Sequence, residues 1–219
     1  MKRLKILIII GHGGNDVGAV SGNLKELVCN VNIATAMFNA MKPYCDVTIE
    51  TNNTPLEGEI ALVNSGNWDI VISVHNNAGG GDGFEAYYYS GDNEMLKMLQ
   101  SIEKEVVKIG QNSRGLKPNT TFRIIRAVKP SSVILEGFFL DNANDRSQFD
   151  ELHEQQALGM AYAKGVMNYL GVNYTPPTTP STSNKMYRVI TGSFKERKNA
   201  ENRLQELKNK GFDSFIEVK

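Results

Sequence analysis

Cysteine is scarce in this sequence, and long apolar runs are absent. Its 219 residues include only Cys29 and Cys45, too few for a disulfide framework. Because Cys29 lies among apolar residues and Cys45 opens a strand-like run, we expect buried, reduced thiols. No stretch approaches the roughly 18 apolar residues of a membrane-spanning helix, so we expect no membrane span. The formal net charge is zero, and nothing in the composition points to a nucleic-acid partner.

A convincing export signal is also lacking. The N-terminal sequence MKRLKILIIIGHGG places basic residues before an apolar run, as a signal peptide does. The run is short, is interrupted by Lys5, and leads into polar residues without a small-residue cleavage site. It is more typical of a buried first strand. We therefore expect the protein to be made in the cytoplasm without a signal peptide.

One linker divides the chain. Residues 174–184, YTPPTTPSTSN, contain three prolines together with threonine and serine, a composition typical of an extended spacer. The sequence therefore predicts a body at residues 1–173 and a tail at residues 185–219.

The body alternates strand and helix patterns. Continuous apolar runs predict buried strands, and apolar residues at helical spacing predict helices. The predicted strands are Lys5–Ile10, Asp46–Thr51, 69–74, Phe84–Tyr89, 122–128 and 132–135. Among them, Phe84–Tyr89 is expected to be more exposed than 69–74. The predicted helices are 24–41, 56–63, 93–109 and 151–170. This alternation predicts an α/β fold, in which helices flank a twisted, mostly parallel or mixed sheet.

Polar residues follow three of the predicted strands, at the sheet edge where ligand sites collect. His12 follows the first strand, His75 follows the third, and Glu136 ends the sixth. Catalytic zinc usually takes three ligands from His, Asp and Glu. Glu26 is the natural third ligand, because it lies in the first turn of a helix and borders its apolar face. The pattern favours a metal site at His12, Glu26 and His75, and the alternative is two loop histidines and a solvated glutamate.

Glu136 lies inside the apolar stretch VILEGFFL. An unpaired buried charge is costly, so this carboxylate must be ion-paired, metal-bound or functional. An ion pair with Arg123 or Arg126 is the structural alternative. The functional interpretation is a general base or acid beside the metal.

Two further features favour simpler interpretations. His153 begins an amphipathic helix, and we expect it to be exposed and not a ligand. The sequence IIIGHGGNDVGAVSG is similar to a dinucleotide-binding glycine loop, but Asp16 occupies the third glycine position. We therefore do not expect a nucleotide cofactor.

Four motifs, in this order, resemble the zinc-dependent N-acetylmuramoyl-L-alanine amidases (the Amidase_3 family). They are GHGGNDVGA, LKE, SVHNNA and VILEGFFLDN, which begin at residues 11, 24, 73 and 133. The resemblance implies a compact sheet-and-helix fold and one Zn²⁺ ion held by His12, Glu26 and His75. It also implies that Glu136 is the catalytic carboxylate, with Asn77 and Arg126 near the substrate.

The resemblance also implies the reaction, which is cleavage of the amide joining N-acetylmuramic acid to L-alanine of the peptidoglycan stem peptide. No regulatory insertion is evident after residue 78, as suits a lytic enzyme. We expect a phage or prophage endolysin that acts on the cell wall after release or lysis. A sporulation autolysin with the same chemistry, a zinc peptidase cutting within the stem peptide, and a wall-binding protein with a degenerate site are the alternatives.

The tail resembles the SPOR domains that bind peptidoglycan. Its sequence predicts a strand at 187–194, a helix at 198–208 and a strand at 214–218. The resemblance implies two such strand–helix–strand units per domain, whereas this tail has one. A segment of about 35 residues is also short for folding unaided. We expect two tails to pair in a homodimer through the C-terminal segment. The alternative is a tail that packs on the body or stays partly loose.

Overall fold

The computed structural model describes residues 4–51, 56–175, 192–211 and 216. The chain divides into two compact units, Met1–Pro177 and Thr178–Lys219. None of the helices in the described ranges combines the length and apolar character needed to cross a lipid bilayer.

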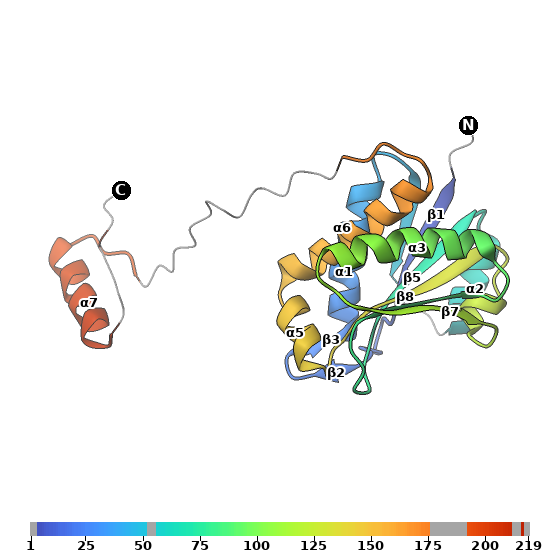
Figure 1. The fold of residues 1–219 in the computed structure, drawn as a ribbon. Helices are drawn as coiled ribbons and strands as arrows, with labels where there is room; N and C mark the ends of the chain where they lie inside the picture. Colours follow the sequence, from blue (N-terminus) through green and yellow to red (C-terminus); the bar gives the residue numbers. More distant parts are fainter. Residues whose placement is uncertain (1–3, 52–55, 176–191, 212–215, 217–219) are drawn as a thin grey trace. The chain divides into compact units, whose positions relative to one another are not determined.

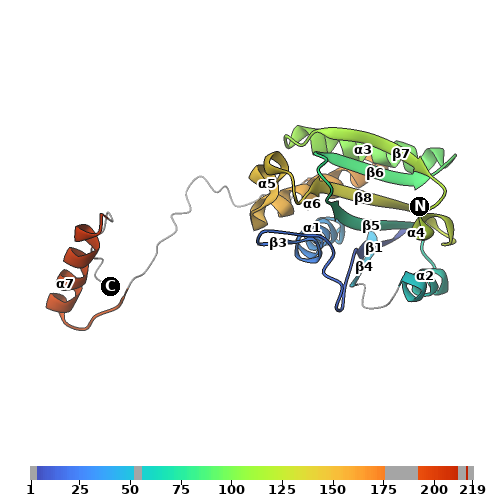
Figure 2. The same cartoon turned by 90° about the horizontal axis from the view of Figure 1, so that it is seen from below.

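A six-stranded sheet forms the centre of the first unit. Its strands, in spatial order, are β4 (Asp46–Thr51), β1 (Lys5–Ile10), β5 (Ile70–Asn77), β8 (Ser131–Phe139), β6 (Phe84–Tyr89) and β7 (Ser113–Asn119) (Figure 2). β6 runs antiparallel to β8, and the other neighbouring pairs are parallel. A small antiparallel hairpin of β2 (Val20–Ser21) and β3 (Leu24–Lys25) lies outside this sheet. The predicted α/β fold with a mixed sheet is confirmed.

Helices cover both faces of this sheet. On one face, α6 (Leu152–Tyr169) contacts both α1 (Glu26–Met41) and α3 (Asn93–Lys108) (Figure 1). The other face carries a smaller apolar cluster, to which α2 (Leu56–Ser65) and α4 (Arg123–Arg126) contribute. A short helix, α5 (Ala143–Phe149), precedes α6.

The first strand is buried on both faces, as its unbroken apolar run predicts. Ile6, Ile8 and Ile10 belong to the larger apolar cluster, whereas Leu7 and Ile9 belong to the smaller one. Successive side chains point to opposite faces of a strand, so β1 needs apolar residues at every position. Both cysteines are buried and outside any disulfide, as predicted.

The strand predicted at residues 122–128 is wrong. This segment forms the short helix α4, which begins after a turn closed by the Asn119 side chain. Asn119 accepts hydrogen bonds from the backbone N–H groups of Thr121 and Phe122, at 2.8 and 2.7 Å. The consecutive residues Ile124 and Ile125 are both buried, a pattern that a helical turn satisfies and an alternating strand does not.

Three other features differ from the sequence predictions. The strand β6 is mostly buried and not exposed, because α3 and the antiparallel pairing with β8 cover it. The strand β7 and the helix α5 were not expected. The sequence of β7, SRGLKPN, contains glycine, proline and four polar or charged residues, and most of these residue types are uncommon in strands.

The second unit contains α7 (Arg197–Asn209), which confirms the helix predicted at 198–208. Two ion pairs along this helix join Arg197 to Glu201 at 2.8 Å and Arg203 to Glu206 at 3.0 Å. Most of the linker at 174–184 lies outside the described residues. The same holds for most of the two strands predicted at 187–194 and 214–218.

Candidate metal centre and catalytic residues

His12, Glu26 and His75 come together at one edge of the sheet. Their ligand atoms all lie within 4.8 Å of one another. The Glu26 carboxylate lies between the two rings, with Oε2 3.0 Å from His12 Nε2 and Oε1 3.2 Å from His75 Nδ1. The imidazole rings meet edge to face, with their centroids 5.1 Å apart. The structure thus brings together the three residues that the sequence favours as metal ligands.

The loop after β1 orients His12. The backbone N–H of Gly11 continues the pairing with β5 by donating to the Val74 carbonyl at 2.9 Å, and the chain then turns sharply. His12 itself has a φ of +64°, a left-handed conformation that is uncommon for residues other than glycine. Its Nδ1 lies 2.9 Å from Asp16 Oδ2, which leaves Nε2 directed at Glu26. Histidine ligands in metal sites commonly have such a partner on the second ring nitrogen.

The start of α1 fixes Glu26, whose side chain is buried. Backbone N–H groups of Ala19 and Asn76 donate to its two carboxylate oxygens, at 3.0 and 3.2 Å. Burial opposes ionisation, but hydrogen bonds from His12, His75 and Ala19 hold the pKa of Glu26 well below its usual range. Glu26 in turn is the largest cause, ahead of Asp16, of a pKa of about 9 at His12. The carboxylate is therefore anionic and held in place.

Two glycines make room for the imidazole rings. A Cβ on Gly11 would lie 2.2 Å from the ring of His75. A Cβ on Gly18, whose φ is +66°, would lie 2.5 Å from the Glu26 carboxylate and 2.7 Å from the His12 ring. The glycine-rich sequence after β1 therefore serves close packing of the three side chains.

His75 and Glu136 are paired residues on adjacent strands. Both lie within their strands, β5 and β8, and not just past them as the sequence suggests. The strands continue because β8 pairs with β5 on one side and with β6 on the other. Directly paired residues point to the same face, with Cβ atoms about 5 Å apart. Glu136 therefore lies beside His75, and the ladder becomes irregular only between His75 and Asn77.

The surroundings of Glu136 favour its protonated form near neutral pH. Burial is the largest cause, and the negative charges of Glu26 and Glu85 add to it, while the nearby His75 opposes them. Together they raise the pKa of Glu136 to about 7. A carboxyl group with such a pKa can both accept and donate a proton at neutral pH.

An ion pair between Glu136 and a nearby arginine is not found in the described part of the chain. Arg123 donates instead to Glu57 on α2, at 2.6 Å. Arg126 is exposed and donates to the backbone carbonyl of Thr121, at 3.3 Å. Among the described residues, no contact joins Arg126 to the metal ligands, and its expected position near the substrate stays a prediction.

Asn77 does lie near Glu136. It ends β5, and its side chain donates to Glu85 on β6 at 3.0 Å. Glu85 is the partner of Glu136 in the β6–β8 ladder. His153, at the start of α6, is exposed, as expected.

A buried amide network behind the metal ligands was missed at the sequence level. Asn30 donates to the Gly11 carbonyl at 2.9 Å and accepts from Asn76 at 2.7 Å. Asn30 lies one helical turn after Glu26, which is the only sequence signal that could have identified it. Asp16, the partner of His12, carried a clearer signal, since it lies four residues after His12 in the same loop.

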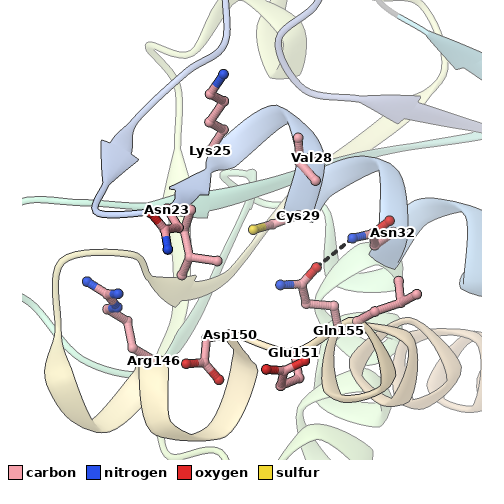
Figure 3. Close-up of a pocket in the computed structure, with 11 residues that line it drawn as sticks. Asn23, Lys25, Val28, Cys29, Asn32, Arg146, Asp150, Glu151 and Gln155 are labelled. Atoms are coloured by element: carbon pink, nitrogen blue, oxygen red, sulfur yellow. Dashed lines mark hydrogen bonds between the residues drawn. The ribbon is translucent and has the colours of Figure 1, made fainter. Parts of the chain in front are cut away.

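A pocket of about 380 Å³ has a lining that does not include the candidate metal ligands (Figure 3). It is lined by residues from α1, α5 and α6, where Asn32 and Gln155 are joined by a 2.7 Å hydrogen bond. Neither Glu136 nor any of the three candidate metal ligands lines it. Cys29 does, but burial raises the pKa of its thiol to about 11, so it is not a thiolate nucleophile at neutral pH.

Two imidazoles and one carboxylate suit Zn²⁺, which catalytic sites hold with three such ligands while keeping a position open. A second carboxylate, Glu136, lies on the adjacent strand with a pKa near neutrality. The fold is that of an α/β protein, and this donor set could hold a single metal ion at one edge of the sheet.

The chain belongs to the N-acetylmuramoyl-L-alanine amidase family. The sequence profile of that family matches residues 6–168, and the profile of the SPOR domain matches residues 161–216. The SPOR match thus begins before the tail predicted at 185–219 and includes the end of α6.

Individual relatives agree with the family. The sporulation-specific N-acetylmuramoyl-L-alanine amidase of Bacillus subtilis (strain 168) is 28% identical over 223 residues, which span 99% of this chain and 85% of the relative. The endolysin of Bacillus phage SPP1 is 26% identical over 74% of this chain and 64% of its own. The crystal structure of an N-acetylmuramoyl-L-alanine amidase from Clostridium difficile 630 superposes with a TM-score of 0.69 and 24% identity. That match covers 78% of this chain and 98% of the other, and it shows the shared fold.

Proposed function

We propose that this protein is a zinc-dependent N-acetylmuramoyl-L-alanine amidase, which hydrolyses the amide bond between N-acetylmuramic acid and L-alanine in peptidoglycan. One observation carries the proposal. His12, Glu26 and His75 converge within 4.8 Å, beside a carboxylate on the next strand, in a chain of this amidase family. The donor set and the family agree on a metal-dependent hydrolase.

His12, Glu26 and His75 would hold the ion. A Zn²⁺ ion bound there supplies Lewis-acid chemistry, which lowers the pKa of bound water and polarises a carbonyl group. The protein contributes a ligand set that is largely preformed. Asp16 holds the His12 ring, and backbone N–H groups hold the Glu26 carboxylate.

Glu136 moves the proton in this proposal. Its carboxylate accepts a proton as water attacks the scissile carbonyl carbon, and it then delivers that proton to the L-alanine nitrogen as the C–N bond breaks. A pKa of about 7 suits both steps, because the group must be a base first and an acid afterwards. Such general acid–base catalysis typically contributes about 10²–10⁴-fold.

Digestion of purified peptidoglycan tests this function. The expected products are intact glycan strands and stem peptides with a free L-alanine amino group, identified by mass spectrometry. Chelator should abolish the reaction, and added Zn²⁺ should restore it. Fragments cut between stem-peptide residues would instead indicate the peptidase alternative, and binding without any cleavage would indicate a wall-binding protein with a degenerate site.

For the biological role, similarity over the whole chain favours a sporulation autolysin over the predicted endolysin. One of the relatives that match along almost the entire chain, tail included, is the sporulation-specific enzyme, whereas the phage endolysin matches over about three quarters of it. Gene context separates the two roles, since lysis genes beside this one would support the endolysin. Cytoplasmic synthesis, and access to the wall after release, stay predictions.

The tail is proposed to bind peptidoglycan, because the SPOR profile matches it. We also propose that two tails pair to make one complete binding domain. Sedimentation tests the pairing, and a concentration-dependent dimer is the expected result. A monomer with a folded tail at all concentrations would contradict it.

A further inference from the structure

A second polar cluster lies next to the candidate catalytic carboxylate, centred on Glu85. This side chain is 3% exposed, yet four donors reach its two oxygens. Oε1 accepts from Asn77 at 3.0 Å and from Tyr87 at 2.7 Å. Oε2 accepts from Arg114 Nε at 2.9 Å and from Lys117 Nζ at 2.5 Å. Glu85 thus holds two cationic side chains from β7 on one anionic oxygen.

The cluster continues the row of side chains that begins at the metal ligands. His75 pairs with Glu136, and Glu136 pairs with Glu85, so the three point to the same face of the sheet. Lys117 pairs with Tyr87 on that face. Because adjacent strands lie about 4.8 Å apart, the β7 backbone lies about 10 Å from that of β8, and both cationic side chains reach from it toward Glu85 on the strand between.

The Arg114 and Lys117 side chains are held in place, and each has N–H donors that Glu85 does not use. The Arg114 guanidinium lies over the Phe139 ring at 5.0 Å, and the Lys117 ammonium over the Tyr87 ring at 5.6 Å. Their side chains remain 37% and 36% exposed. Arginine has five N–H donors and lysine three, so Glu85 uses only a part of them.

At Glu85, two positively charged side chains face one negatively charged carboxylate. The single charge of Glu85 balances one of the two cations. Burial raises the pKa of Glu85, but hydrogen bonds, of which that from Lys117 has the largest effect, lower it below its usual value. Asp82 approaches Arg114 only to 3.7 Å and is 51% exposed, so water screens this pair. The buried Glu85 carboxylate therefore has two cationic partners, both partly exposed.

We propose that Arg114 and Lys117 bind a carboxylate of the stem peptide, the free α-carboxylate of its second residue. The inference rests on the proposed amidase function. An extended peptide advances about 3.4 Å per residue, so the second residue lies about 7 Å beyond the scissile amide, within reach of both side chains. Glu85, Asn77 and Tyr87 are positioning residues that preorganise the pair.

Two soluble substrates test this subsite with the full chain. Both are N-acetylmuramoyl peptides that begin L-alanyl-D-glutamyl, and they differ only in whether the glutamyl α-carboxyl group is free or is a carboxamide. The wild-type protein should prefer the free carboxylate by about tenfold or more in kcat/KM, mainly through KM, as expected for loss of a charge-assisted hydrogen bond. A second pair of substrates, which differ only at the third residue, should give a much smaller difference in kcat/KM.

Three variants assign the preference to these residues. Lys117→Gln and Arg114→Gln should each bring the ratio of the two substrates close to one, whereas Lys117→Arg should keep most of it. Lys97→Gln, on the helix that covers the opposite face, removes an exposed charge as a matched control and should behave as wild type. The ratio is internal to each protein, so a folding defect lowers both rates and leaves it unchanged.

Three results would overturn the proposal. Equal cleavage of the two substrates by the wild-type protein would remove the subsite while leaving the amidase intact. Variants that slow both substrates equally would assign the cluster a structural role only. Failure of the wild-type protein to cleave either substrate, or peptidoglycan itself, would overturn the proposed function and the subsite with it.

Discussion

At the scale of single residues, the two glutamates have opposite electrostatic surroundings. Glu26 is held anionic by two imidazoles and two backbone N–H groups, whereas Glu136 has a pKa near 7 because burial and neighbouring carboxylates disfavour its charge. This contrast is the physical reason for giving the first the role of ligand and the second the role of proton carrier.

The raised pKa of Glu136 predicts a cost in stability. An ordinary glutamate has a pKa of 4.5, and the folded protein raises it to about 7, so the folded state binds more protons between these values. The stability that comes from this tighter proton binding is fully present below pH 4.5 and is lost as the pH rises through about 7. In chelator-treated protein at pH 8, Glu136→Gln should therefore be more stable than wild type by up to about 3 kcal/mol.

Denaturant unfolding at two pH values measures this difference. At pH 4 the side chain is neutral in both proteins, and their free energies of unfolding should agree. Equal stability at pH 8 as well would show that the site does not disfavour the Glu136 charge.

Gly11 predicts a second effect at this scale. The Cβ in Gly11→Ala would lie 2.2 Å from the His75 ring, so the ring must move. We expect the affinity for Zn²⁺, measured by competition with a chromogenic chelator, to fall at least tenfold, as is typical when the support of a ligand is disturbed. Gly91→Ala is the control: its Cβ has nothing within 4 Å, so it strains only its own backbone, at a φ of +93°, and should cost stability but bind Zn²⁺ as wild type does. Unchanged affinity in Gly11→Ala would mean that the ring tolerates displacement.

At the scale of helices and strands, the packing of α6 on α1 depends on a glycine. A Cβ on Gly159 would lie 2.2 Å from the Ile33 carbonyl oxygen, which is backbone and cannot rotate away. Gly159→Ala should separate the two helices and cost about 1–3 kcal/mol of stability, as overpacking does. Thermal unfolding measures the loss, and Gln156→Ala, an exposed change in the same helix, should be close to neutral. An unchanged melting temperature in Gly159→Ala would show that the helices can move apart freely.

The elements with strong periodicity were predicted from sequence, and those shaped by tertiary contacts were not. Lys5–Ile10 and Asp46–Thr51 form strands at the predicted bounds, since apolar residues are continuous in the first and alternate with polar ones in the second. Residues 122–128 have a strand composition, but an Asn119 turn and the sheet face beneath make a helix there. The β7 strand exists because β6 offers it a partner, which its own sequence does not reveal.

The candidate site likewise contains residues that the sequence predicts and residues that it does not. His12, Glu26, His75 and Glu136 could be proposed from sequence, because strand ends and a helix start place polar residues at one edge. The Glu85 cluster could not be, since FEAYYY is typical of an ordinary strand. Its donors come from three strands, and only the register across β5, β6 and β7 brings them together.

At the scale of the whole molecule, the chain has two compact units with separate proposed tasks. A chain that ends at residue 175 should cleave soluble muramoyl peptides at the wild-type rate but bind insoluble peptidoglycan more weakly. Co-sedimentation with purified walls measures the binding. Wild-type binding by the shortened chain would show that the tail does not recognise the wall, and loss of turnover on soluble substrate would show that the first unit needs it.

The most direct test of the central claim measures Zn²⁺ content and turnover on the same preparations of Glu136→Gln and His75→Ala. The account predicts one Zn²⁺ per chain and a loss of turnover of about 10²–10⁴-fold in Glu136→Gln, because only the proton carrier is removed. It predicts that His75→Ala, which lacks a ligand, loses the Zn²⁺ itself. A Glu136→Gln protein without Zn²⁺, or one that turns over at the wild-type rate, would contradict the division of roles between the metal ligands and Glu136.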